Sequence, residues 1–177
     1  MRYRWIAFGM ICLSVVAAAA QAPVPKPGPE QKRLEVFVGS WTFEGQFRGG
    51  TIGQGGKVTG TETSQMLGGF FVERHYKEKG PAGERRGIHV FGHDPVKKTY
   101  ITSDFDSMGG YGSGTASVSG NTWTFSEHRV GGAKPLQNRC VLTFAAGNRS
   151  FTVKCKVSTD GQTWAPGFEG RWTRMRS

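Results

Sequence analysis

Turn signals recur about every ten residues along most of this chain, and this spacing constrains the fold more than any other feature. The segments between the turns are short, rich in threonine, valine and aromatic residues, and poor in proline. This pattern is typical of a meander of antiparallel strands. We expect about ten strands, near residues 41–47, 57–66, 70–79, 86–93, 98–106, 112–119, 121–129, 138–145, 150–158 and 168–175.

The connections between these segments carry residue pairs that favour tight reversals, such as Gly80-Pro81, Asp94-Pro95 and Asp160-Gly161. Consecutive strands need no crossover helices, and closing a sheet of this length removes its exposed edges. A membrane-spanning barrel needs an apolar band on every strand, which the segment Tyr100 to Asp106 cannot supply. The sequence therefore predicts an all-β, antiparallel up-and-down barrel.

One segment before the first strand has helical spacing. Pro29 suits the first position of a helix, and Gly39 suits the position after its last turn. Leu34, Phe37 and Val38 share one face at this spacing. We expect one short helix of about two turns lying against the barrel.

The first residues have the pattern of an export signal. Arg2 and Arg4 precede the uncharged apolar run Ile6 to Ala20, and Ala20-Gln21-Ala22 offers small residues for cleavage. The run is shorter than the roughly twenty residues of a membrane span, so an uncleaved anchor is the weaker alternative. We expect a signal peptide over 1–22, a proline-rich spacer over 23–29, a single barrel domain over 30–177, and a periplasmic or secreted location.

The formal net charge of the chain is +10, and its basic residues are scattered rather than clustered. A solvated basic surface explains this better than a nucleic-acid site, because no basic helix or stacking platform accompanies the charge. Attraction to anionic lipid or to an anionic ligand stays open. We make no prediction of the oligomeric state.

Two cysteines, Cys140 and Cys155, follow the N-terminal run. The segments on either side of Gly147-Asn148 form a symmetric hairpin pattern that places these cysteines directly opposite each other. Opposed residues of a non-hydrogen-bonded pair have Cβ atoms about 4.5–5.5 Å apart, close to disulfide reach. We predict a disulfide. Two free thiols or half of a metal site are the alternatives, the latter weak because no second Cys or His pair has ligand spacing.

A tryptophan and two arginines lie at opposite ends of the expected barrel sequence. Gly39-Ser40-Trp41 begins the first strand, and Arg171 and Arg174 lie in the last. This arrangement resembles the calycin superfamily, in which the tryptophan plugs the closed end of the barrel and an arginine stacks over it. The resemblance implies a structural role for Trp41 and for either arginine, since a cation over an indole stabilises by about 0.5–2 kcal/mol.

Four segments carry a closer resemblance over residues 30 to 174: Val38 to Trp41, Leu67 to Glu73, Gly92 to Pro95 and Asp106 to Gly109. Their order is similar to that in the exported bacterial proteins grouped as the domain of unknown function 1579. His93 stands where that family more often has tyrosine. The resemblance implies a calycin-like barrel and no particular activity.

Three further patterns have weaker chemical interpretations. Asp104 and Asp106 share a strand face and could hold a metal or act as acid and base, but we interpret them as solvated strand-end residues, with a cap of the following turn as the alternative for Asp106. Ser158 to Trp164 resembles a single, shortened Asp-box, which a hairpin turn with a packed tryptophan explains better. His89 and His93 lie about 13 Å apart on a strand, too far to share one metal. We expect no metal and no cofactor, haem included.

Alternate residues of a small barrel point inward, and a pocket is usually an apolar wall with a few polar groups. Trp123, Phe125 and Glu127 share one face of an expected strand, and Phe71, Glu73 and His75 share one face of another, so each set combines aromatic and polar side chains. We expect a small, partly apolar or anionic ligand inside the barrel, bound by residues drawn from Glu73, His75, His89, Trp123, Phe125 and Glu127.

Ligand binding is favoured over catalysis, and no residue is assigned a catalytic role. The first alternative is a small hydrolase or isomerase that uses a histidine and a carboxylate in the same cavity. The second is an interaction protein whose barrel is filled by its own side chains and which acts through its basic surface.

Overall fold

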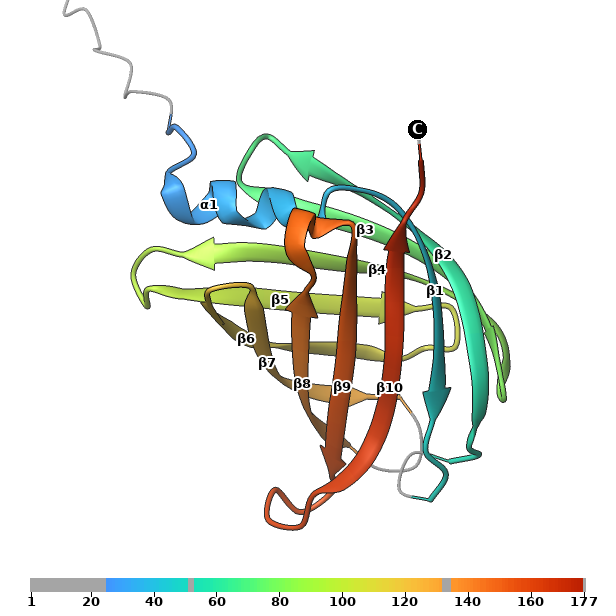
Figure 1. Cartoon of the computed structure of the whole chain (residues 1–177). Helices are drawn as coiled ribbons and strands as arrows, with labels where there is room; N and C mark the ends of the chain where they lie inside the picture. Colours follow the sequence, from blue (N-terminus) through green and yellow to red (C-terminus); the bar gives the residue numbers. More distant parts are fainter. Residues whose placement is uncertain (1–24, 51–52, 132–134, 177) are drawn as a thin grey trace, which may run out of the picture.

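A computed structural model describes residues 25–50, 53–131 and 135–176, so the expected signal peptide lies outside the described residues. Within these residues ten antiparallel strands form a closed barrel, in which each strand pairs with the next and β1 pairs with β10 (Figure 1). The predicted all-β, up-and-down, calycin-like barrel is confirmed. The strands are β1 (Gly39–Phe47), β2 (Gly56–Leu67), β3 (Phe71–Gly80), β4 (Gly83–Asp94), β5 (Thr99–Asp106), β6 (Tyr111–Ser119), β7 (Thr122–Val130), β8 (Leu136–Phe144), β9 (Ser150–Ser158) and β10 (Ala165–Arg174).

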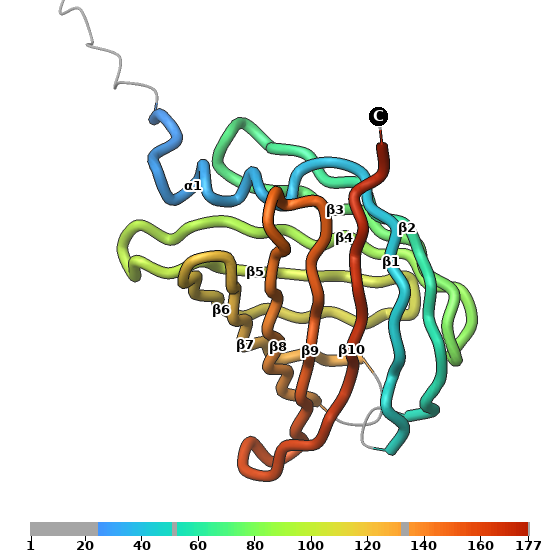
Figure 2. The backbone as a smooth tube through the Cα atoms, viewed as in Figure 1, coloured from blue at the N-terminus to red at the C-terminus, as the bar shows by residue number. Residues whose placement is uncertain are grey.

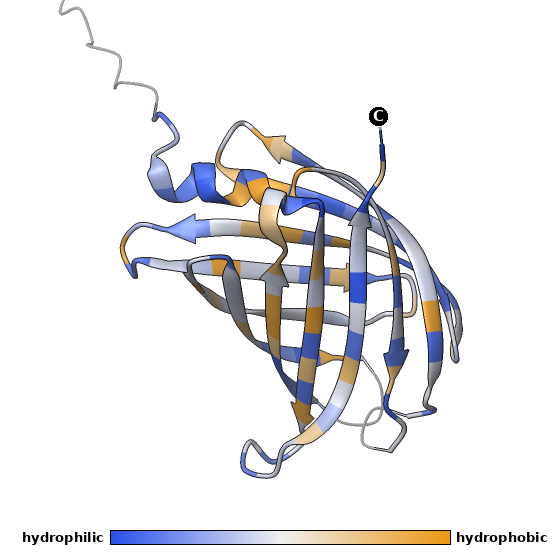
Figure 3. Cartoon of the chain, in the orientation of Figure 1, coloured by the Kyte–Doolittle hydropathy of each residue, from blue (hydrophilic) through white to orange (hydrophobic). Residues whose placement is uncertain are grey.

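The strand bounds follow the turn signals closely. The largest differences are at β4 and β10, which begin at 83 and 165 rather than at 86 and 168. β10 begins early because its pairing with β9 shifts register between Pro166 and Phe168, and the strand continues on both sides of this irregularity. In Figure 2, β4–β7 run at a steep angle to β8–β10, so that two curved walls enclose the interior. Hydropathy alternates along β8–β10 (Figure 3), as expected for strands with one face inside.

The N-terminal helix covers one end of the barrel (Figure 1). α1 (Pro29–Arg33) continues into the 3₁₀ turn η1 (Leu34–Phe37), so the predicted two-turn helix is present with a tightened last turn. Leu34 and Phe37 are 0% and 1% exposed and insert into the aromatic core. The Tyr100 hydroxyl donates to the Glu30 carboxylate at 2.7 Å, which ties the helix to β5. Burial, reinforced by Glu30, raises the pKa of Tyr100. None of the helices in the described part of the chain has the length and apolar character that a bilayer span requires.

Trp41 fills the helix-covered end. It is fully buried and its Nε1 donates to the Phe37 carbonyl at 3.0 Å. Arg174 lies directly opposite Trp41 in the β1–β10 register, and its guanidinium sits 4.1 Å from the centre of the ring. Of the two candidate arginines, Arg174 therefore stacks on the tryptophan, whereas Arg171 is exposed and donates to Ser150 Oγ at 2.9 Å.

The same arginine explains the glycine of the motif. Arg174 Nη2 donates to the Val36 carbonyl at 3.1 Å and Nη1 donates to the Val38 carbonyl, which satisfies acceptors left free where η1 ends. Gly39 has a φ of +127°, and a Cβ at this position would overlap the Arg174 guanidinium. A side chain at residue 39 would thus displace the cation from Trp41.

The turn between β9 and β10 contains the segment that resembles an Asp-box. Asp160 Oδ1 accepts from the backbone N–H groups of Gln162 and Thr163 at 2.8 Å each, and from Ser158 Oγ at 2.8 Å. Trp164 packs under Arg139, whose guanidinium lies 4.0 Å from its ring centre. The segment is a hairpin turn closed by its own hydrogen bonds.

These bonds make stability depend on pH. The backbone donors hold the pKa of Asp160 below its usual value, so the charged carboxylate stabilises the fold above the unfolded pKa and loses this effect as pH falls through the folded pKa. We expect the stability advantage of wild type over Asp160→Asn to be constant above about pH 5 and to shrink below about pH 4. The difference between the urea unfolding midpoints of the two proteins, determined above about pH 5 and again below about pH 4, measures this change. Glu44→Gln, at an exposed carboxylate without a side-chain hydrogen bond in the described residues, is the control and should show no such trend.

Candidate functional site

The barrel encloses a cavity of ≈ 620 Å³. It reaches the end opposite α1, where the turns β1–β2, β3–β4 and β5–β6 contribute Gln54, Pro81 and Met108 to its rim. The interior is therefore not filled by side chains, and the filled-barrel alternative does not fit this structure. The two walls of the cavity differ in chemistry.

The wall formed by β1, β9 and β10 is apolar. Phe43 stacks on Trp172 with ring centres 4.8 Å apart, and the ring centres of Phe47 and Phe168 are 5.0 Å apart. Val153 on β9 continues this surface and is 6% exposed. This wall can bury the apolar body of a ligand.

Guanidinium and carboxylate groups alternate along the opposite wall, on β3, β4, β5 and β7. Arg85 Nη2 donates to Glu78 Oε1 at 2.6 Å, and its Nη1 donates to Asp106 Oδ2 at 3.5 Å. Arg129 Nη2 donates to the same Asp106 oxygen at 3.1 Å, and its Nη1 donates to Asp104 Oδ2. Burial by itself lowers the pKa of Arg85, but the Glu78 carboxylate raises it overall, so the guanidinium stays charged.

The interpretation of Asp104 and Asp106 as solvated residues was therefore wrong, whereas the alternative that Asp106 caps the following turn is confirmed. Asp104 is 2% exposed and lines the cavity. Asp106 Oδ1 accepts from the backbone N–H groups of Met108 and Gly110 at 2.9 Å each. Burial opposes ionisation of Asp106, but these bonds and the nearby arginines hold its pKa below the usual value. The compensating Arg129 comes from β7, so a view of β5 alone cannot reveal it.

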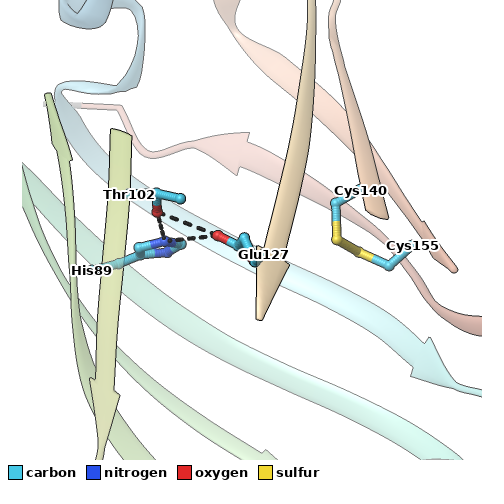
Figure 4. Close-up of a disulfide and its surroundings, with 5 residues drawn as sticks. All are labelled: His89, Thr102, Glu127, Cys140 and Cys155. Atoms are coloured by element: carbon cyan, nitrogen blue, oxygen red, sulfur yellow. Dashed lines mark hydrogen bonds and ion pairs between the residues drawn. A yellow bond between two sulfur atoms is a disulfide. The ribbon is translucent and has the colours of Figure 1, made fainter. Parts of the chain in front are cut away.

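A second polar cluster lies deeper in the barrel (Figure 4). His89 Nε2 is 2.6 Å from Thr102 Oγ1 and 3.4 Å from Glu127 Oε1, and Thr102 Oγ1 donates to Glu127 Oε1 at 3.3 Å. Burial would raise the pKa of Glu127, but the His89 contact lowers it overall. His89 lines the cavity, whereas Glu127 lies behind that lining. His89 and Glu127, two of the six ligand-binding residues predicted from the sequence, therefore lie in contact with each other.

Trp123 and Phe125 also face inward, but they belong to the packed core under the helix. Trp123 lies 5.0 Å from Phe37, and Phe125 lies 5.6 Å from Phe91, between ring centres. Both side chains are under 5% exposed, and neither lines the cavity. The inward orientation predicted for them is correct, and their position favours a structural role.

The inward orientation expected for Glu73 and His75 was wrong. Both side chains lie on the outer face of β3, where His75 Nε2 is 2.5 Å from Glu73 Oε1. The two-residue turn after Gly80 places His75 opposite Ile88 and Arg74 opposite His89. Directly opposed residues share a face, so an inward His89 requires an inward Arg74. β3 carries polar residues on both faces, so the alternation of apolar and polar residues that normally identifies the inward face is missing.

Three inward residues that the sequence analysis missed form a buried group beside the apolar wall. Trp172 Nε1 donates to Glu62 Oε2 at 3.0 Å, and Arg74 Nε lies 3.1 Å from the same oxygen. The guanidinium of Arg74 also lies 5.1 Å from the ring centre of Phe91. Arg74 and Glu62 thus form an ion pair by distance, although the angle at Arg74 Nε does not make a hydrogen bond. The register of the short β3–β4 turn is the signal that could have identified Arg74.

The hairpin predicted around Gly147 has the expected register. Cys140 and Cys155 are directly opposed and form a disulfide, with Cα atoms 4.1 Å apart (Figure 4). This short separation is typical of a non-hydrogen-bonded pair. Both cysteines face inward, and Cys155 lines the cavity. Within the described residues, no group of three or more His, Cys, Asp or Glu side chains is arranged to hold a metal ion.

A closed, helix-capped antiparallel barrel with an internal cavity defines a calycin-like protein. The family model for the protein of unknown function DUF1579 matches residues 26–174, and the chain belongs to that family. Comparison with curated proteins gives no match.

Solved structures with this fold include the following two. The crystal structure of Rv2717c from M. tuberculosis has a TM-score of 0.61 at 12% identity, covering 85% of this chain and 100% of that one. The S-type phycobiliprotein lyase CPES from Guillardia theta has a TM-score of 0.55 at 13% identity, covering 84% and 93%. At these identities the similarity establishes the barrel and no shared activity.

Proposed function

We propose that this protein binds one small, partly apolar ligand inside its barrel. The observation that carries the proposal is the ≈ 620 Å³ cavity with an apolar wall on one side and a charged wall on the other. Such a divided lining is what orients an amphipathic ligand, because the apolar wall supplies burial and the polar groups supply direction. His89 is the sequence-predicted residue that lines this cavity with its side chain.

We also propose that the protein acts outside the cytoplasm, in the periplasm or as a secreted protein. The disulfide supports this location, because such bonds persist in oxidising compartments. The charged and apolar residues at the N-terminus support it independently. In this proposal residues 1–22 are the signal peptide, residues 23–29 are a spacer, and residues 30–177 are the mature domain. Nucleic acid is not among the proposed partners.

Native mass spectrometry of the protein purified from its own host tests the binding function. We expect an added mass at one-to-one stoichiometry. Val153→Trp places an indole in the cavity and should abolish the adduct, whereas Val141→Trp, at a 41% exposed position on the outer face of β8, should retain it. A bare chain, or an adduct that both variants keep, would contradict the proposal. Near-UV circular dichroism confirms that both variants are folded.

An enzymatic alternative rests on the contact between His89 and Glu127 at 3.4 Å, since a histidine beside a carboxylate is a common acid–base pair. It requires the bound molecule to be converted during incubation, and it requires the conversion to stop in Glu127→Gln. Release of the molecule unchanged from the wild-type protein would eliminate this alternative and leave ligand binding intact.

A further inference from the structure

We propose that the ligand carries a cationic nitrogen head, such as an amine, amidinium or guanidinium, which binds at Asp104 while its apolar body lies on the Phe43–Trp172 wall. This inference rests on the proposed function and specifies its ligand class. It follows from the charge along the cavity wall, from the hydrogen bonding of Asp104 and from the aromatic surface opposite.

The charges on the wall do not balance. The chain of ion pairs runs Glu78, Arg85, Asp106, Arg129, Asp104, so it begins and ends on a carboxylate. Within this chain of ion pairs three carboxylates therefore share two guanidiniums, and the Arg74–Glu62 pair, which also lines the cavity, adds no net charge. The excess negative charge contrasts with the net charge of +10 of the whole chain. A cation entering this low-dielectric space is attracted more strongly than it would be in water.

Asp104 is the carboxylate of this wall whose hydrogen bonding is incomplete. Its Oδ2 accepts from Arg129, but its buried Oδ1 has no hydrogen-bond partner in the described part of the chain. Leaving such an acceptor unmatched costs about 1–3 kcal/mol, and more when it is charged. This oxygen packs against Gly112, so the carboxylate has to rotate to meet a ligand N–H group, and a positive head would then offset the excess charge as well.

The groups around Asp104 favour a cation over an anion. Arg74 lines the cavity outside the chain of ion pairs and is therefore the best candidate to bind an anion. Its charge is already offset by Glu62, whose Oε2 lies 3.1 Å from Arg74 Nε. Its unmatched Nη1 remains able to donate to a neutral ligand oxygen. On the opposite wall Trp172 is stacked between Phe43 and Phe151, with ring centres 4.8 and 5.2 Å away, so this row of rings supplies apolar surface for the body of the ligand rather than a second charged site.

Three probes that differ only in the head group test the assignment. Titration calorimetry compares n-octylammonium, 1-octanol and octanoate on the wild-type protein after removal of any bound molecule. We expect the ammonium to bind at least about tenfold more tightly than the other two, because a charge-assisted hydrogen bond contributes about 1.5–3 kcal/mol. Equal or tighter binding of octanoate or octanol overturns the cationic head. This comparison needs no variant.

Asp104→Asn then tests the site itself. We expect it to weaken octylammonium by about tenfold or more and to leave octanol unchanged. Glu73→Gln is the matched control, because it also neutralises a carboxylate but lies on the outer face of the barrel. Unchanged ammonium binding in Asp104→Asn, with near-UV circular dichroism like that of wild type, overturns the assignment to Asp104.

The two proposals fail separately. If none of the three probes binds, the cationic-head inference is overturned, while a one-to-one adduct in native mass spectrometry still supports ligand binding. If the adduct itself is an anion or a neutral molecule, ligand binding stands and this inference falls. A bare protein in native mass spectrometry together with silent calorimetry contradicts both.

Discussion

Replacing Trp41 by alanine should destabilise the barrel by about 3–5 kcal/mol, the range for deleting a fully buried tryptophan side chain. Trp41 is 0% exposed and lies 5.0 Å from Phe151 between ring centres. Its removal leaves a void at the helix-covered end, frees the Phe37 carbonyl and takes away the surface on which Arg174 rests. Because Arg174 also binds carbonyls at the end of η1, the helix should loosen with the barrel end.

Equilibrium unfolding in urea measures this loss, with intrinsic fluorescence and far-UV circular dichroism as two readouts. Trp164→Ala is the matched control, since Trp164 lies at the β9–β10 turn and contacts Arg139 rather than the core. We expect the control to lose no more than about 1–2 kcal/mol. A loss from Trp41→Ala as small as that of the control would show that Trp41 does not hold the closed end.

Removing the disulfide should cost about 3 kcal/mol in the chain-entropy account, because the bond closes a loop across a sequence separation of 15 residues. The double variant Cys140→Ser, Cys155→Ser removes it without changing the length of either side chain by much. Both cysteines face the interior, so the variant also places two hydroxyls beside the cavity, which adds to the loss.

A reductant separates these two contributions. Urea unfolding of the wild-type protein with dithiothreitol removes the bond alone and should account for most of the loss. The double variant should show the same stability with and without reductant. An unfolding midpoint of the wild-type protein that does not move on reduction would contradict a stabilising role for the bond.

Much of the barrel could be predicted from local sequence, because strand alternation and turn chemistry act over neighbouring residues. The hairpin around Gly147 illustrates this: its symmetric flanks set the register that brings Cys140 opposite Cys155. The Gly-x-Trp motif likewise indicated a plugged end, although only the β1–β10 register selects Arg174 over Arg171. The inward faces of Trp123 and Phe125 followed from alternation between apolar and polar residues.

The candidate site was only partly visible in the sequence. His89 and Glu127 were identified by residue type, but the cavity is lined by Arg74 and Tyr76 rather than by Glu73 and His75. A shift of one residue moves a side chain to the other face of a strand, and β3 is polar on both faces, so hydropathy alone could not choose.

The sequence by itself determined the strands, their order, the short helix and the paired cysteines, since each depends on residues close together in the chain. Only the tertiary structure decided the charge of the interior. Asp104 on β5 meets Arg129 on β7 across β6, because both lie in register with Gly112, which has no side chain to separate them. Burial of a charge is tolerated only when a partner is near, and partners two strands apart are set by the register across the sheet rather than by the pattern within one strand.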